Sequence, residues 1–197
     1  MNVNLQYDTD FLAGIYYDDS LQLNSYSISM HMVTQSKDAA VTNIAMERLK
    51  AFVQTELSNV VFINQTNDSM AETLYSAGCN ICTLPEEPVD QIVGMMLYCK
   101  LNAIMEGQMI IDNLDISSVL GDSVWYQHYE EDSVGPFSAD GWWYKNSTQK
   151  DTLELEDAAD NVVKVQSTGW NEYGLDWPEV KLEKSAKVLD FKKHEKK

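Results

Sequence analysis

The spacing of apolar residues changes along this chain, and each change marks a different kind of element. Residues 11–17 form an apolar and aromatic run that ends at the turn-forming tripeptide Asp18-Asp19-Ser20. Apolar and polar side chains then alternate over residues 27–33, which is typical of a strand with one buried face. The two runs predict an N-terminal β-hairpin.

A helical period follows over residues 36–57, where apolar side chains recur every three or four positions. Ser36 is a suitable N-cap, and Asp38 falls in the first turn, where a negative charge favours the helix dipole. Glu47 points roughly 170° away from the apolar stripe, and Arg48 roughly 70°. We therefore expect Glu47 to face solvent, and Arg48 to be half-buried and paired with a carboxylate or with backbone carbonyls.

Strands and helices alternate over the rest of the first 120 residues. The predicted elements are a buried strand at 59–64, a short helix from Asp68 or Ser69 to Gly78, a strand at 81–84, a helix from Pro88 to Glu106, and a strand at 109–119. This order predicts an α/β or α+β fold: a mixed sheet with an N-terminal hairpin, three helices and β-α-β units, followed by a β-rich C-terminal section.

The character of the sequence changes at Gly121. All five tryptophans lie beyond it, four of them at Trp142, Trp143, Trp170 and Trp177, and residues 153–166 alternate on either side of a turn, as in a hairpin. We predict an α/β core domain at 1–120, a β-rich aromatic section at 121–180 packed on that core, and a flexible lysine-rich tail at 181–197.

Charge is divided unevenly between these parts. Residues 1–180 carry 28 acidic and 7 basic side chains, whereas residues 181–197 carry 7 lysines and 3 acids, so the net charges are −21 and +4. An acidic body repels nucleic-acid phosphates and acidic lipid headgroups and attracts basic proteins. We expect a basic protein partner and no direct binding of nucleic acid or membrane. We also expect the oppositely charged tail to dock either on the acidic body or on a neighbouring copy, which would give a homo-oligomer.

Composition also bears on location. No basic stretch followed by an apolar run is present, and the most apolar segment, residues 89–105, contains Asp90, Lys100 and Asn102. We expect a cytoplasmic protein with reduced cysteines. Lysine outnumbers arginine 13 to 1, which is typical of AT-rich genomes such as those of many phages, so a phage-encoded protein would act in the host cytoplasm.

Cys79 and Cys82 have the spacing of zinc and redox sites. A zinc site needs about four ligands, and no second pair follows at a suitable spacing. A redox pair favours a helix N-terminus, whereas Pro85 and Pro88 separate these cysteines from the next helix. We interpret both as structural cysteines, and we predict no metal and no cofactor.

An aromatic band with acids at its centre is the leading candidate for a docking surface. Aromatic anchors beside carboxylates suit a basic partner, which the negative field would steer into contact. The predicted partner-binding residues are Trp125, Tyr126, Tyr129, Glu130, Glu131, Asp132, Trp142 and Trp143. We therefore expect an acidic, non-enzymatic interaction protein with an inhibitory or assembly role.

Two alternatives remain open at this stage. The element order resembles that of ribonuclease-H-like folds, which would imply a metal-dependent hydrolase or nuclease. Its candidate carboxylates are Asp8 or Asp10, Glu47, Asp68, and Asp112 or Asp115. The second alternative is a small-molecule binder at the loop that follows the buried strand, with Asn64, Asn67 and Asp68 as its ligand-binding residues.

Overall fold

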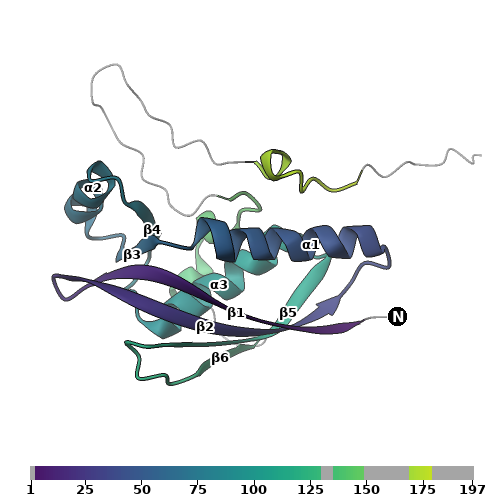
Figure 1. The fold of residues 1–197 in the computed structure, drawn as a ribbon, viewed down its shortest axis with the longest axis horizontal. Helices are drawn as coiled ribbons and strands as arrows, with labels where there is room; N and C mark the ends of the chain where they lie inside the picture. Colours follow the sequence, from purple (N-terminus) through teal and green to yellow (C-terminus); the bar gives the residue numbers. More distant parts are fainter. Residues whose placement is uncertain (1–2, 130–134, 149–168, 179–197) are drawn as a thin grey trace, which may run out of the picture.

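The computed structural model describes residues 3–129, 135–148 and 169–178. Its centre is a six-stranded mixed sheet in the order β4-β3-β1-β2-β5-β6, with three helices around it (Figure 1). The predicted class, a mixed sheet with an N-terminal hairpin, three helices and β-α-β units, is confirmed.

The hairpin of β1 (Asn4–Tyr17) and β2 (Ser20–Thr34) is the longest strand pair of the described sheet. Asp18 and Asp19 both adopt positive φ, as a two-residue hairpin turn requires, so the predicted turn is confirmed. Both strands begin earlier than the pattern predicted, at Asn4 and Ser20, and their added positions include few buried residues.

Two parallel strands extend the sheet beyond β1. β3 (Val60–Asn64) pairs with β1, and β4 (Asn80–Leu84) pairs with β3, both in parallel. Helix α2 (Asp68–Ser76) connects β3 to β4, which confirms the predicted β-α-β unit. Gly78 has φ of +86° just beyond α2, the left-handed conformation that the predicted C-terminal cap needs.

Helices α1 (Ala39–Ala51) and α3 (Asp90–Met105) are the longest described helices. The N-cap of α1 is Asp38, whose carboxylate accepts from the Ala40 N–H, while the Ser36 hydroxyl accepts from the Asp38 N–H. The prediction of Ser36 as the N-cap is therefore wrong by two residues. Helix α1 continues into η1 (Phe52–Glu56), one turn of π-helix.

Antiparallel strands complete the other side of the sheet. β5 (Met109–Ser118) pairs with β2 across a bulge near His31, and β6 (Tyr126–Tyr129) pairs with β5. In the described part of the predicted 121–180 section, β6 is followed by the 3-10 turns η2 (Gly135–Ser138), η3 (Trp142–Tyr144) and η4 (Trp170–Tyr173). The predicted hairpin at 153–166 and the predicted tail at 181–197 lie outside the described residues.

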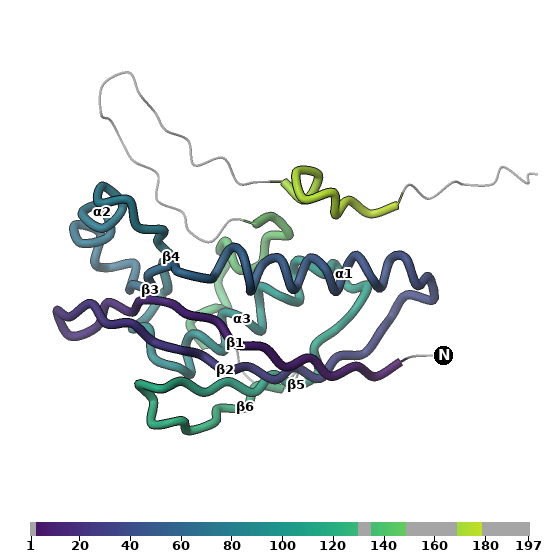
Figure 2. Tube along the Cα trace, in the orientation of Figure 1, coloured from purple at the N-terminus to yellow at the C-terminus, as the bar shows by residue number. Residues whose placement is uncertain are grey.

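The two faces of the sheet are covered differently. The main core contains Phe11, Tyr26 and Ile28 from the sheet together with residues of α1 and α3, so both helices lie on one face. A second cluster packs α2 against Val61 and Ile81 on the opposite face, at the β3–β4 end only. No described element covers that second face over β1, β2, β5 and β6, as the chain trace also shows (Figure 2).

Candidate functional site

The uncovered part of the sheet is the candidate site, and we call it the open face. Residues that pair directly across neighbouring strands share a face, so the register places its side chains in rows. One row runs from Asp8 through Ser29 and Asp115 to Gln127, and its neighbours contain His31 and Asp10. The open face consists of Gln6, Asp8, Asp10, Leu12, Leu21, Leu23, Ser25, Ser27, Ser29, His31, Asn113, Asp115, Gln127 and Tyr129.

Serine hydroxyls hold two of the three aspartates of this face in place. Ser27 Oγ donates to Asp10 Oδ1 and Ser29 Oγ donates to Asp8 Oδ1, each at 2.6 Å. The hydrogen bond from Ser29 and a second one from Gln6 lower the pKa of the Asp8 carboxyl. These donors therefore favour the ionised carboxylate and fix its direction, while both aspartates stay exposed.

No lysine or arginine neutralises the carboxylates within the described sheet, although the charge of the nearby His31 contributes to lowering the pKa of Asp8. Strands β1, β2, β5 and β6 contain no lysine and no arginine. Strands lie about 4.8 Å apart and alternate residues about 7 Å apart, so Asp8, Asp10 and Asp115 form an array of negative charges without a lysine or arginine on the same strands. Such an array attracts cationic side chains spaced along an extended or helical segment.

One end of the open face is apolar. Leu12, Leu21 and Leu23 lie near the hairpin turn, and Leu23 is 86% exposed, the largest value among the exposed apolar residues of the described chain. Their strand partners are Ser25, Tyr16 and Gly14. The open face therefore offers aliphatic contact beside its carboxylates, which is the composition of a protein-docking surface.

The predicted aromatic anchors divide between this surface and the core. Trp125, Tyr126 and Tyr129 are exposed at the β6 edge, and Tyr129 pairs with Asn113 on the open face. Glu130, Glu131 and Asp132 lie outside the described residues.

Trp142 and Trp143 are buried, so the expectation that they are exposed anchors is wrong. The indole N–H of Trp142 donates to Thr83 O, and that of Trp143 donates to Phe137 O. Tryptophan is suited to such positions because burial satisfies its large apolar surface while one N–H reaches a carbonyl.

In the predicted small-molecule loop, the Asn64 side chain forms hydrogen bonds within the protein. Asn64 Oδ1 accepts from both the N–H and the hydroxyl of Thr66, and Asn64 Nδ2 donates to Glu87. Asn67 is the N-cap position of α2 without a side-chain bond to the helix, and Asp68 is exposed in its first turn. Asn64 therefore closes a turn between β3 and α2.

The carboxylates of the hydrolase alternative are not brought together. Asp8, Asp10 and Asp115 lie on the open face, whereas Glu47 lies on α1, across the sheet, where it pairs with Lys50 as a solvent-facing residue. Asp68 begins α2, and Asp112 is an exposed residue at the β5 bulge. Within the described residues, no group of three or more histidine, cysteine or acidic side chains has the geometry of a metal site.

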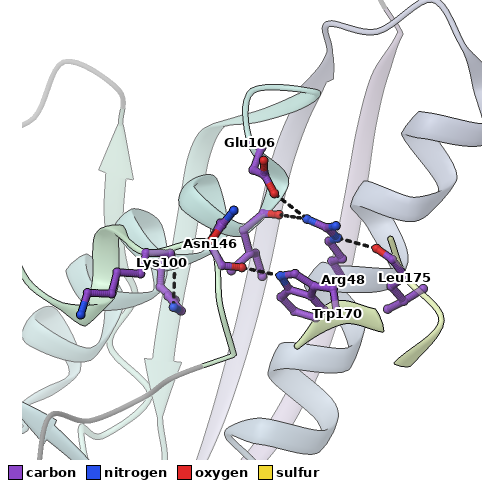
Figure 3. A network of polar contacts seen from close by, with 8 residues as sticks. Arg48, Lys100, Glu106, Asn146, Trp170 and Leu175 are labelled. Carbon is purple, nitrogen blue, oxygen red and sulfur yellow. Dashed lines mark hydrogen bonds and ion pairs between the residues drawn. The ribbon is translucent and has the colours of Figure 1, made fainter. Parts of the chain in front are cut away.

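Two buried cations occupy the helix-covered side of the molecule (Figure 3). Arg48 donates to Glu106 Oε1 at 2.8 Å and to the carbonyls of Ile104 and Leu175, and its guanidinium lies 4.0 Å from the ring centroid of Trp177. The expected pairing of Arg48 with a carboxylate and with backbone carbonyls is confirmed, although the side chain is more deeply buried than its wheel position predicted. These contacts attach residues 169–178 to α1.

Lys100 is the second buried cation. Its ammonium group donates to the carbonyls of Trp142 and Lys145, at 3.1 and 2.8 Å, and lies over the rings of Phe52 and Trp142. Burial lowers the pKa of Lys100 to about 7. Neither buried cation reaches the open face, so both hold the fold together rather than contribute to the candidate site.

The cysteine pair is divided between the two apolar clusters. Cys82 belongs to the main core, while Cys79 packs against the α2 cluster, and neither forms a disulfide. Cys79 precedes β4, next to the end of α2, whereas Cys82 lies within β4 on the side that faces the main core. In the described residues, no helix is long and apolar enough to cross a bilayer.

Comparisons with known proteins assign no family. No family model and no curated protein matches the chain. The fold is similar to an uncharacterised protein from Wolinella succinogenes, at a TM-score of 0.46 and 11% identity over 66% of this chain and 99% of that one. It is also similar to a Plasmodium vivax 6-pyruvoyltetrahydropterin synthase, at a TM-score of 0.43 and 9% identity over 66% of this chain and 98% of that one. The Plasmodium falciparum synthase gives a TM-score of 0.39 and 11% identity over 65% of this chain and 98% of that one.

The aspartates of the open face were named from the sequence only as metal ligands. The signal that would have found this surface is the period-two placement of Gln6, Asp8 and Asp10 in β1 opposite the serines of β2. Assigning Asp115 to the same surface requires the pairing of β2 with β5, which is a contact between residues 86 positions apart in the chain.

Proposed function

We propose that the protein is a non-enzymatic interaction protein that binds a basic protein partner through the open face by charge complementarity. The observation that carries this proposal is the array of Asp8, Asp10 and Asp115 on strands that contain no lysine or arginine. The exposed aromatics at the β6 edge and the leucines near the hairpin turn supply apolar contacts beside the charges.

The mechanism is steering followed by local contact. A surface of one charge sign raises the association rate of a cationic partner, and added salt weakens this effect because it screens charges over about 8 to 10 Å. Serine-anchored carboxylates lose little side-chain freedom when a lysine binds, since their direction is already fixed.

The test uses a dye-labelled deca-lysine peptide as the probe and fluorescence anisotropy as the readout. One variant carries Asp8→Asn, Asp10→Asn and Asp115→Asn, and asparagine keeps an acceptor oxygen for the serine hydroxyls. The matched control carries Glu72→Gln, Glu86→Gln and Glu172→Gln, which remove the same number of charges from exposed positions elsewhere.

The open-face variant should bind the peptide about tenfold more weakly at low salt, since exposed ion pairs contribute roughly 0.2 to 1 kcal/mol each. The affinity of the control variant for the peptide should fall by less than about twofold, since its three acids lie outside the array. Equal losses in the two variants would show that the peptide responds only to net charge, and the proposal would then be rejected.

A further inference from the structure

The open face is uncovered in the described structure, and the same chain contains a segment of matching chemistry. Residues 181–197 carry 7 lysines and 3 acids, whereas the four strands of the open face carry aspartates and no lysine or arginine. The charges of the segment and of the face are therefore complementary.

The apolar residues match as well. The segment contains Leu182, Val188, Leu189 and Phe191 among its lysines. The open face presents Leu12, Leu21 and Leu23 beside Asp10, all of them exposed. A segment that mixes lysines with aliphatic side chains can contact both parts of this surface, whereas a purely basic peptide can contact only the carboxylates.

The length of the chain allows the contact. The described residues end at Pro178, and the hydrogen bond from Arg48 to Leu175 places this end on the α1 side of the sheet (Figure 1). The 19 residues that follow can span up to about 60 Å when extended. The path around one helix layer and the sheet is about 30 Å, so the segment can reach the open face.

We propose that residues 181–197 dock on the open face of their own chain and compete there with the basic partner. This inference rests on the proposed function for the choice of surface. Docking within one chain benefits from an effective concentration in the millimolar range, so weak contacts suffice to occupy the face. A partner must then displace the segment, which raises the affinity and the charge that the partner needs.

The experiment uses the full chain throughout. In the test variant, Lys187, Lys192, Lys193 and Lys196 are replaced by glutamine; in the matched control the same four lysines are replaced by arginine, which keeps the charge. Anisotropy with the deca-lysine peptide measures competition. Zero-length carbodiimide cross-linking of the unsubstituted chain, followed by peptide mass spectrometry of the monomer fraction, locates the segment.

The glutamine variant should bind the peptide about threefold or more tightly than the unsubstituted chain, and the arginine control should bind it like that chain. Cross-links within the monomer should join the segment to Asp8, Asp10 or Asp115. Cross-links found only between two chains would overturn docking within one chain, and cross-links spread over acids elsewhere would overturn the choice of surface.

Failure of the proposed function gives a different result. Suppose that neither the unsubstituted chain nor the glutamine variant binds the peptide, but the segment cross-links to the open face within the monomer. The docking inference then stands and the partner proposal fails. If the peptide binds equally to both lysine variants, no cross-link reaches the open face, and the variant with Asp8→Asn, Asp10→Asn and Asp115→Asn still binds the peptide about tenfold more weakly, the partner proposal stands and the docking inference fails.

Discussion

Replacement of Lys100 by methionine should change how the stability of this protein depends on pH. Lys100 is fully buried in α3, and its ammonium group is bound by two backbone carbonyls and, among the described residues, by no carboxylate. Burial lowers its pKa from 10.5 to about 7. Methionine has a similar length and flexibility and cannot ionise, so it removes the titration while it fills most of the same space.

The sign follows from the protons bound in each state. Below pH 7 the lysine is charged in both the folded and the unfolded chain, so the full penalty for burying the charge is present. Between pH 7 and 10.5 the unfolded chain binds more protons, and the stability of the folded state therefore rises with pH. The slope is half-maximal at pH 7 and approaches about 1.4 kcal/mol per pH unit above it, so the gain between pH 7 and pH 9 is about 2 kcal/mol.

The assay is urea unfolding of the wild type and the Lys100→Met variant at pH 6, 7, 8 and 9, with a reductant present. Cys99 also titrates near this range, and burial raises the pKa of its thiol, which lowers stability as pH rises. The variant retains Cys99, so the difference between the two proteins isolates the lysine. Lys37→Met, at an exposed position, is the control and should follow the wild type.

The expected result is a free energy of unfolding that rises with pH in the wild type relative to the variant. The stability of the methionine variant relative to the wild type should be greatest at pH 6. This gain is reduced because the carbonyls of Trp142 and Lys145 lose their hydrogen-bond donor in the variant. Parallel pH profiles for wild type and variant would refute the reasoning, because they would mean that Lys100 is charged in the folded state across the whole range.

Two further substitutions test other parts of the fold. Arg48→Lys should destabilise the protein by about 1 to 3 kcal/mol in urea unfolding, because lysine cannot donate to a carboxylate and two carbonyls in one plane. The control, Lys50→Arg at the solvent-facing pair with Glu47, should change stability little. Equal effects of the two substitutions would contradict this account. Asn64→Ala should cost about 1 to 2 kcal/mol in thermal unfolding, whereas Asn67→Ala, which removes no side-chain cap bond, should cost less than about 0.5 kcal/mol; the reverse order would be inconsistent with the turn described here.

Periodicity located most elements because it reflects contacts between residues close in the chain. The hairpin turn at Asp18 and Asp19, the buried strand β3 and the C-terminal cap of α2 all follow from local pattern. The pairing of Arg48 was also predictable, since the helical wheel placed a cation beside the apolar stripe and an unpaired charge there is costly. The choice of Ser36 over Asp38 as N-cap failed because both side chains can accept from a backbone N–H two residues further on.

In the aromatic section, local sequence pattern does not determine which tryptophans are buried. Trp125 and Trp142 have equally polar neighbours in the sequence, yet the first is exposed and the second is buried. The difference depends on whether α3 and β4 lie against the side chain, and those elements are some 20 to 60 residues away in the chain. Lys100 is a similar case, because its neighbours in α3 did not reveal that η3 closes over it.

The open face shows most clearly what the sequence pattern determines and what only the tertiary structure determines. Alternation in β1 and β2 settles which side chains share a side of each strand, since that depends only on the two-residue repeat of extended backbone. Whether that side is covered depends on long-range pairing: β5 adds Asp115 to the array, and α2 shields only the β3–β4 end. A surface shared by several strands exists only after they pair, so its charge pattern could be recognised only in the folded molecule.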